Sequence, residues 1–177
     1  TVVKARRQIT LRDLLNHTAG IGYGGGIAGE EWKKAGIQGW YFAHLDEPIG
    51  ETIKRMARLP MEAQPGTKWV YGYNTDILGV VIERASGMSL DQFLKTRIFD
   101  PLGMTDTYFY LPKDKASRLA TVYAPKEGEP LKVAPVAGTM DSQGAYVDGP
   151  RKSFSGGAGL LSTARDYCLF RQTMANG

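Results

Sequence analysis

One predicted helix, bounded by a turn and a glycine, constrains the fold of this chain more than any other stretch. Pro65 and Gly66 predict a turn before it, since this pair strongly interrupts regular structure. The helix is predicted from about Asn74 to Gly87, because apolar side chains recur on one helical face and glycine favours a left-handed end. Its apolar face is formed by Ile77, Val81, Ile82 and Ala85. The residues between the turn and the helix are therefore held at both ends.

Tyr71 lies in this held stretch, just before the predicted helix. A turn on one side and a rigid helix on the other would fix a functional phenol in place. The structural alternative is a buried tyrosine whose hydroxyl bonds to the backbone. The local pattern leaves both alternatives open and favours the buried one.

Shorter elements fill the rest of the chain and indicate an α+β fold that is mostly helical. Helices are predicted over residues 11–17, 30–37, 49–59, 89–98 and 162–175. Strand-like structure is predicted at residues 107–110, and a hairpin or strand-like loops within residues 121–136. No repeat, low-complexity segment or linker interrupts these elements. We therefore expect residues 1–177 to belong to a single domain without an internal boundary.

The last predicted helix carries the only cysteine of the chain. Tyr167, Phe170 and Met174 recur on one face, which predicts that this face is buried. Cys168 lies beside Leu169 and Phe170 and is predicted to be a small core side chain. A single cysteine cannot form an internal disulfide, and it leaves the cellular compartment undecided.

Composition argues against several classes of function. The chain is 42% hydrophobic and 23% charged, as is ordinary for a globular domain. Its net charge of +4 is not gathered into a basic tract, so nucleic-acid binding is not expected. No apolar run is long enough to span a membrane, and the two histidines lack metal-ligand spacing. We therefore expect no nucleic-acid partner, no membrane span and no metal or other cofactor.

Four segments resemble, in the same order, motifs of the serine β-lactamase-like superfamily. Around Tyr71, W-x-Y followed by D-I-L-G resembles the second active-site motif of this superfamily. Residues 9–20, 98–107 and 155–167 resemble its T-x-R-D-L-L-x-H-T-x-G, I-F-x-P-L-G-M-x-D-T and G-G-x-G-L-x-S-T-x-x-D segments. The pattern is similar to that of esterases and acyltransferases related to class C β-lactamases, and of penicillin-binding-protein-like enzymes.

The resemblance also implies which part of the fold this chain supplies. The family places a Ser-x-x-Lys segment before the His-Thr-x-Gly segment and a Lys-Thr-Gly-like strand after the last helix. No serine in this chain has a lysine three residues later, and the lookalike Thr1-Val2-Val3-Lys4 has no predicted helix around it. Residues 1–177 are therefore expected to be a partial domain, the mostly helical middle of the β-lactamase/transpeptidase-like fold.

Family chemistry gives Tyr71 a role by resemblance. Enzymes of this superfamily transfer acyl groups through a serine acyl-enzyme, and a motif tyrosine moves protons to and from the serine. A free phenol titrates at about pH 10, and an adjacent ammonium favours the phenolate, which can act as a general base. By this match Tyr71 is the catalytic candidate, and the substrate-binding candidates are Tyr73, Gly156 and Gly157.

The second motif departs from the family pattern directly after its tyrosine. The family usually has Tyr-Ser/Ala-Asn, whereas Gly72 and Tyr73 take the second and third positions here, and Asn74 comes one place late. The amide that would hold a polar group of the substrate is displaced by one position. This departure weakens an assignment to β-lactams and favours simple esters.

These features predict a serine hydrolase, and more specifically a carboxylesterase that acts on a small-molecule ester. Its nucleophile is expected outside this chain. The 177-residue chain alone is expected to be inactive. Its partner is the missing remainder of the domain, in the same parent chain or in another chain. The alternatives are a non-catalytic binding or scaffold module of the same fold, and β-lactamase or acyltransferase activity in the parent. A hydrolase that uses Thr1 or a histidine triad is a more distant alternative.

Overall fold

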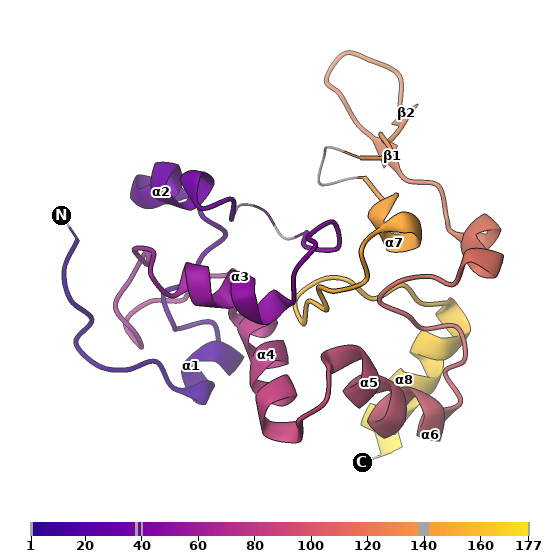
Figure 1. Cartoon of the computed structure of the whole chain (residues 1–177), viewed down its shortest axis with the longest axis horizontal. Coiled ribbons are helices and arrows are strands. Elements are labelled where there is room, and N and C mark those ends of the chain that lie inside the picture. Colours follow the sequence, from indigo (N-terminus) through magenta and orange to yellow (C-terminus); the bar gives the residue numbers. More distant parts are fainter. Residues whose placement is uncertain (1, 38, 40, 138–141, 177) are drawn as a thin grey trace.

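The computed structural model describes residues 2–37, 39, 41–137 and 142–176. In chain order the helices are α1 (Leu11–Leu15), α2 (Gly29–Lys34), α3 (Ile49–Met56), α4 (Asn74–Ser86), α5 (Leu90–Leu94), α6 (Asp100–Leu102), α7 (Ala145–Asp148) and α8 (Ala164–Asn176). Shorter helical pieces are the 3-10 helices Gly26–Ala28 and Lys113–Arg118 and the π-helical Lys95–Phe99. The strands β1 (Tyr123–Ala124) and β2 (Lys132–Val133) form the one sheet of the described part (Figure 1). None of the helices in the described ranges is both long and apolar enough to cross a membrane.

Helix α4 lies between two halves of the molecule (Figure 1). It contacts α1 and α3 on one side and α5 on the other. A first core cluster gathers residues of α2, α3 and the chain around them, and Ile77 of α4 packs against it. A second cluster gathers Leu90, Tyr110 and Tyr146, and Ile82 of α4 packs against that one. One helix thus joins both cores.

The predicted ends of α4 are confirmed, but its buried face differs from the prediction. The helix begins at Asn74, and Gly87 follows its last residue in the left-handed conformation, with a φ of 71°. The buried residues are Asn74, Asp76, Gly79 and Val80, whereas Ala85 is exposed. The polar pair is buried because side chains of two other segments hydrogen-bond to it. The spacing of apolar residues in a sequence identifies a face that is buried by apolar packing. It does not identify a helix face that is buried through polar contacts.

Helix α1 is short and firmly capped. The Thr10 hydroxyl accepts the N–H of Asp13 at 3.2 Å, and the Asp13 carboxylate accepts the N–H of Thr10 at 2.8 Å, which forms a capping box. Arg7 donates to the same carboxylate from two nitrogens, at 2.6 and 2.8 Å. The Arg7 guanidinium and the Thr10 donors hold the pKa of Asp13 well below its usual range. The start of α1 is thereby fixed.

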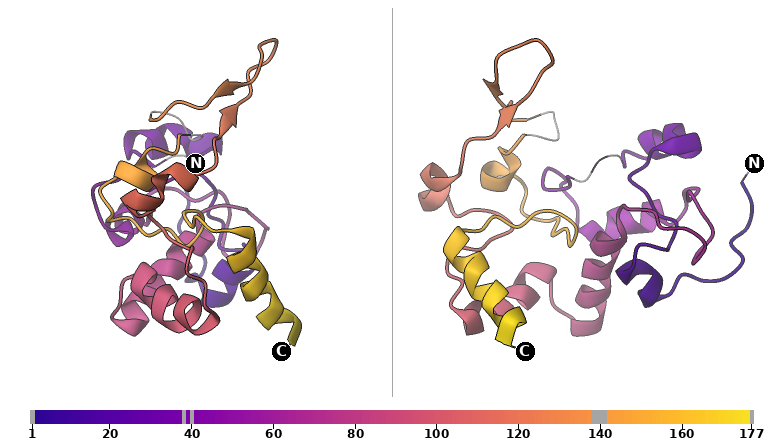
Figure 2. Two further views of the ribbon diagram at one scale, coloured as in Figure 1. Left: turned by 90° about the vertical axis from the view of Figure 1, so that its right-hand side faces the viewer. Right: turned by 180° about the vertical axis from the view of Figure 1, so that it is seen from behind.

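The predicted hairpin and the predicted strand-like run are both confirmed. β1 and β2 pair in antiparallel fashion, with Tyr123 opposite Val133, and the hairpin stands out from the helical body (Figure 2). Within residues 107–110, Tyr108 forms an antiparallel bridge with Leu161, with N–H to carbonyl distances of 2.9 and 2.7 Å. This bridge draws the segment before α8 onto the second core cluster.

Helix α8 is much more exposed than its sequence predicts. Within α8, all of which is described, Asp166 is the one buried residue. The predicted burial of Tyr167 and Met174 is wrong, because both are exposed, and Cys168 is exposed rather than in the core. The helix is anchored at its first turn through Asp166 and leans away from the helical body beyond that turn (Figure 2).

Candidate active site

The loop before α4 carries Tyr71 and is pinned along its length. Near its start, the N–H of Gly66 donates to the carbonyl of Thr18 at 2.8 Å. Nearer its end, the N–H of Val70 donates to the carbonyl of His17 at 2.8 Å. The loop therefore runs beside the end of α1, and it presents Tyr71 with 57% of its surface exposed.

Glycine is required directly after Tyr71. A Cβ on Gly72 would lie 2.4 Å from the carbonyl oxygen of Ile21 and 2.5 Å from the carbonyl carbon of Gly22. Real side chains do not approach backbone atoms this closely, so any larger residue would push the two segments apart. This close approach explains why the serine or alanine of the related motif is absent here.

Three aromatic side chains surround the ring of Tyr71. Between ring centroids, His17 lies at 4.7 Å, Tyr23 meets it edge-on at 5.7 Å and Trp69 stacks on it at 5.9 Å. Burial raises the pKa of Tyr23 to about 12, and the neighbouring Tyr71 and Asp76 add to this shift. Tyr23 therefore stays protonated near neutral pH, and Tyr71 is the more exposed phenol of the pair.

Tyr73 lies in the first core cluster and not at the surface. Its exposed fraction is 0%, and its hydroxyl donates to the carbonyl of Gly39 at 2.6 Å. Trp32 stacks on its ring at 5.9 Å, and Phe42 lies at 5.3 Å. Burial raises the pKa of this phenol. In this chain Tyr73 has no surface from which to contact a substrate, contrary to the expectation from its place in the motif.

Asn74 joins the end of α1, the Tyr71 loop and α4. Its Nδ2 lies 3.0 Å from Nδ1 of His17, 3.3 Å from the carbonyl oxygen of Ile21 and 3.4 Å from that of Val70. The side chain is fully buried, and its Oδ1 has no hydrogen-bond partner among the described residues. The amide nitrogen therefore serves this junction and is not free to hold a substrate.

Gly156 and Gly157 pack against the first turn of α4. A Cβ on Gly156 would lie 2.4 Å from the carbonyl oxygen of Thr75, and one on Gly157 would lie 2.4 Å from Oδ2 of Asp76. The buried Asp76 carboxylate accepts hydrogen bonds from the Ser155 hydroxyl and, at 3.3 Å, from the N–H of Gly157. Burial raises the pKa of Asp76 to about 6, against the opposing effect of these two donors. The structure thus brings both glycines to the helix that follows the catalytic candidate.

The sequence as a whole matches one family model. The family described as Beta-lactamase matches residues 2–177. The chain belongs to the β-lactamase family. This membership confirms the resemblance carried by the four motifs, and it confirms the mostly helical portion of the β-lactamase/transpeptidase-like fold.

Relatives in the β-lactamase family include esterases and acyltransferases. Lovastatin esterase of Penicillium rubens is 33% identical over 96% of this chain and 41% of its own length. Esterase EstB of Burkholderia gladioli is 32% identical over 89% of this chain and 42% of its own length. The solved structure of EstCE1, described as a hydrolase with promiscuous acyltransferase activity, has a TM-score of 0.78 and 27% identity over 96% of this chain and 46% of that one. The chain thus spans about two fifths of the length of the curated relatives that it matches.

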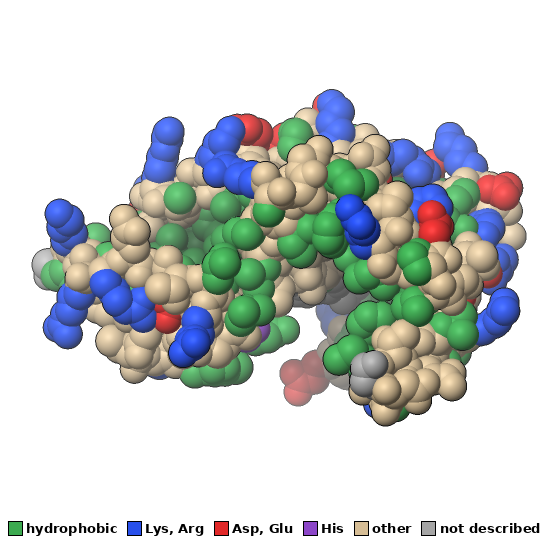
Figure 3. Space-filling view, turned by 90° about the horizontal axis from the view of Figure 1, so that it is seen from below, with side chains coloured by type: hydrophobic (Ala, Val, Ile, Leu, Met, Phe, Trp, Pro, Cys, Tyr) green, Lys and Arg blue, Asp and Glu red, His purple; other side chains and the backbone are tan. Residues whose placement is uncertain are grey.

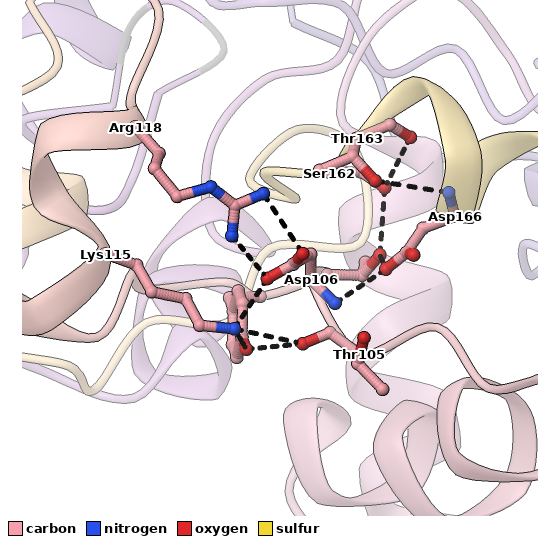
Figure 4. Close-up of polar contacts among 9 residues, drawn as sticks. Thr105, Asp106, Lys115, Arg118, Ser162, Thr163 and Asp166 are labelled. Atoms are coloured by element: carbon pink, nitrogen blue, oxygen red, sulfur yellow. Dashed lines mark hydrogen bonds and ion pairs between the residues drawn. The ribbon is translucent and has the colours of Figure 1, made fainter.

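Two of the β-lactamase-family motifs meet at Asp166 (Figure 4). Its Oδ2 accepts the N–H of Asp106 at 2.7 Å and the hydroxyl of Thr107 at 2.9 Å. The Asp106 carboxylate binds Arg118 at 2.8 and 3.1 Å and Lys115 at 2.5 Å, and these cations lower its pKa to about 2. The contacts join the start of α8 to the segment after α6, so these motif residues have a structural role in the chain.

Two neighbours of Tyr71 are not visible in the sequence. His17 stands in the motif-like segment of residues 9–20, and Tyr23 stands in a glycine-rich loop. Both approach Tyr71 because the loop before α4 pairs with the end of α1. A long-range pairing of this kind leaves no trace in local periodicity.

The structure also bears on Thr1, the alternative nucleophile, and on His44, a histidine that an alternative triad could use. Thr1 lies outside the described residues. His44 is exposed and stacks on Tyr41, with 5.3 Å between ring centroids, and desolvation lowers its pKa. Among the described residues, no group of three His, Cys, Asp or Glu side chains gathers in a way that could hold a metal ion.

Proposed function

We propose that the parent of this chain is a serine hydrolase, in its simplest form a carboxylesterase, and that the chain supplies Tyr71 as the proton-transfer group. The nucleophilic serine would belong to a Ser-x-x-Lys segment outside these 177 residues. The observation that carries the proposal is the exposed phenol of Tyr71, which three aromatic rings hold at the start of α4. Membership of the β-lactamase family supports it.

Exposure distinguishes Tyr71 from the other two phenols at the start of α4. A general base must reach the proton that it abstracts, so a buried phenol bonded to the backbone is unsuitable. Tyr73 is fully buried and donates to a carbonyl, and burial raises its pKa. Tyr23 is half-buried, with a pKa raised to about 12. Tyr71 therefore has the exposure that proton transfer to a neighbouring serine requires.

The proposed reaction consists of two acyl transfers. The Tyr71 phenolate takes the proton of the serine hydroxyl while the serine oxygen attacks the carbonyl carbon of the ester. Tyr71 then gives this proton to the departing alkoxide, which leaves as an alcohol. In the second half, water gives a proton to Tyr71 and attacks the acyl-enzyme, and the proton returns to the serine as the acid leaves. If an alcohol replaces water, the product is a new ester.

The contacts of Asn74 favour simple esters as the substrate class. An amide side chain that binds the polar group of a β-lactam would have to be free, whereas Nδ2 of Asn74 lies within reach of three acceptors of the chain itself. Gly72 adds no polar side chain at the neighbouring position. Esterases among the relatives support the same substrate class.

We further propose that the remainder of the domain docks beside Tyr71. Apolar side chains around α1 and the Tyr71 loop are exposed, namely those of Leu11, Leu15 and Trp69. Figure 3 shows hydrophobic side chains on both sides of a notch between the α1 side of the molecule and the end of α8. Exposed apolar surface gathered in this way is typical of an interface. It supports a domain that is completed by residues outside this chain.

The proposal is tested by ester hydrolysis in the parent protein with two matched variants. Tyr71→Phe removes the phenol hydroxyl, and kcat/KM for a short-chain nitrophenyl ester should fall by at least about 100-fold, as for loss of a general base. Tyr123→Phe is the control, because Tyr123 is 53% exposed in β1 of the projecting hairpin. Its kcat/KM should stay within about twofold of the wild type.

Labelling with a fluorophosphonate probe locates the nucleophile independently of turnover. The probe should modify one serine of the parent outside these residues, and the isolated 177-residue chain should neither react nor hydrolyse the ester. Full activity of the parent Tyr71→Phe variant, or Tyr71-dependent turnover by the isolated chain, would overturn the proposal. A parent that shows neither turnover nor labelling would instead favour the non-catalytic binding module.

A further inference from the structure

His17 has a backbone conformation that the surrounding chain imposes. Its φ is 58°, in the left-handed region that residues other than glycine rarely adopt. The carbonyl of His17 accepts the N–H of Val70 at 2.8 Å, and the N–H of the next residue, Thr18, donates to the carbonyl of Asp13 at 2.8 Å. Unusual backbone of this kind persists only where neighbouring contacts hold it, and it is concentrated at functional sites.

The imidazole of His17 is fixed on one side by Asn74. Nδ2 of Asn74 lies 3.0 Å from Nδ1 of His17 and also faces the carbonyl oxygens of Ile21 and Val70. An amide NH₂ group supplies two N–H donors to this set of acceptors, whereas the amide oxygen would be repelled by the two carbonyls. Nδ1 of His17 is therefore the acceptor, and the proton of the neutral ring lies on Nε2.

The same imidazole also lies beside the rings of Tyr71 and Trp69. The ring centroid lies 4.7 Å from that of Tyr71 at an interplanar angle of 36°, and 6.1 Å from that of Trp69. Trp69 in turn stacks on Tyr71 at 5.9 Å. The three rings are therefore mutual neighbours, with His17 and Tyr71 the nearest pair. His17 is the member that ties this set to the buried side chain of Asn74.

We propose that His17 is a positioning residue, which sets the place of the Tyr71 phenol by packing its imidazole against the phenol ring. The inference rests on the proposed function of Tyr71. His17 gives no proton to substrate in this account; it acts through Tyr71. Reaction rates depend on the placement of catalytic groups, and a displacement of about 1 Å can lower a rate by roughly 100-fold. Loss of the imidazole should therefore lower kcat with little effect on KM.

The substitution His17→Asn isolates the ring contact from the backbone. Asparagine tolerates positive φ better than most residues. Its Oδ1 is attached as Nδ1 is in histidine, so the acceptor for Asn74 is kept while the outer ring atoms are lost. His44→Asn is the matched control, because the chain has two histidines and His44 stacks on Tyr41 instead.

The first readout is the NMR signal of Tyr71 in the 177-residue chain, which needs no catalysis. Tyrosine labelled with ¹³C at Cζ gives signals for nine residues, and Tyr71→Phe identifies the one that belongs to Tyr71. His17→Asn should move this signal, and His44→Asn should leave it in place. An unmoved Tyr71 signal in folded His17→Asn would overturn the inference, whatever the activity of the parent. In the unsubstituted chain, absence of a nuclear Overhauser contact between the His17 and Tyr71 rings would overturn it too, even if the variant fails to fold.

The second readout is ester hydrolysis by the parent protein. His17→Asn should lower kcat by roughly 10- to 100-fold, with KM within about twofold, while His44→Asn leaves both unchanged. An inactive Tyr71→Phe variant beside a fully active His17→Asn variant would overturn this inference and leave the proposed function standing. A fully active Tyr71→Phe variant would overturn the proposed function itself.

Discussion

The carboxylate of Asp166 accepts the backbone N–H of Asp106, 60 residues earlier in the chain, at 2.7 Å. Asp166 has an exposed fraction of 1%, and the same oxygen accepts the Thr107 hydroxyl at 2.9 Å. A buried N–H without a partner destabilises a fold, so this carboxylate satisfies a group that would otherwise oppose folding. The attachment of α8 therefore depends strongly on one side chain.

Removal of the Asp166 carboxylate should destabilise the chain. In Asp166→Ala, the N–H of Asp106 and the hydroxyl of Thr107 lose their acceptor, and the free energy of unfolding should fall by about 2–3 kcal/mol. Asp100→Ala is the control, because Asp100 forms an exposed ion pair with Lys95, which is worth at most about 1 kcal/mol. Urea unfolding of both variants measures the difference. Equal losses in the two variants would contradict the anchoring role of Asp166.

The buried carboxyl of Asp76 predicts a pH dependence of stability. Its folded pKa of about 6 lies above the ordinary value of 3.8, so the folded state binds a proton that the unfolded state lacks between these values. The contribution of Asp76 to the free energy of unfolding should therefore rise as the pH falls through about 6 and level off below about 4. Its full size is roughly 3 kcal/mol, since one pKa unit corresponds to about 1.4 kcal/mol.

The variant Asp76→Asn separates this effect from that of other carboxyl groups. Asparagine cannot titrate, so the rise in unfolding free energy between about pH 7 and pH 4 should disappear. The contribution of Asp106 to the free energy of unfolding changes with pH in the opposite direction. Its folded pKa is lowered to about 2, so this contribution is lost only as the pH falls below about 4. Chemical denaturation at a series of pH values measures both. An unchanged pH profile in Asp76→Asn would disprove the assignment.

A methyl group at residue 157 should be poorly tolerated. In Gly157→Ala the new Cβ would lie 2.4 Å from Oδ2 of Asp76, so the buried carboxylate must move, and overpacking of this kind costs about 1–3 kcal/mol of stability. Gly25→Ala is the matched control, because a Cβ there meets nothing within 4 Å and its φ is −93°. In thermal unfolding, the melting temperature of Gly157→Ala should be clearly lower than that of Gly25→Ala. Similar melting temperatures would show that residues 155–157 pack more loosely than described.

Restoring the usual family residue after Tyr71 should be harmful in this chain. In Gly72→Ala, the added Cβ would lie 2.4 Å from the carbonyl oxygen of Ile21, so the Tyr71 loop must shift from its place. We expect a loss of about 1–3 kcal/mol in stability and a lower kcat in the parent. Unfolding and ester hydrolysis are measured on the same preparations. A variant as stable and as active as the wild type would refute the close approach.

Features with a local cause could be predicted from the sequence. The ends of α4 follow from the apolar period and from Gly87, whose φ of 71° suits glycine, and these ends are where the pattern placed them. The hairpin of β1 and β2 also follows from short apolar runs between turn residues. Tyr71 stands out in the sequence through its motif, and the structure places it as an exposed phenol just before α4, while its catalytic role stays a prediction.

Features with a distant cause could not be predicted. The burial of Asp76 depends on Ser155, which lies 79 residues further along the chain. The contact of His17 with Tyr71 depends on pairing between two loops, and motif position alone would have placed Tyr73 at the substrate. The exposure of Cys168 reflects a helix held at one end, whereas the apolar period predicts a buried face. The first two features depend on neighbours in space that are remote in sequence, and the third depends on how little of α8 the rest of the described chain covers.

The projecting hairpin offers a site for protein engineering. Its tip turns at Gly128, which has a φ of 75°, and the N–H of Glu129 donates to the carbonyl of Lys126 at 3.0 Å. The arm stands clear of the helical body in Figures 1 and 2, and exposed tips of this kind accept inserted sequence well. A fluorescent reporter or an affinity tag grafted between these strands would therefore let the chain be tracked or immobilised while the Tyr71 loop keeps its native surroundings.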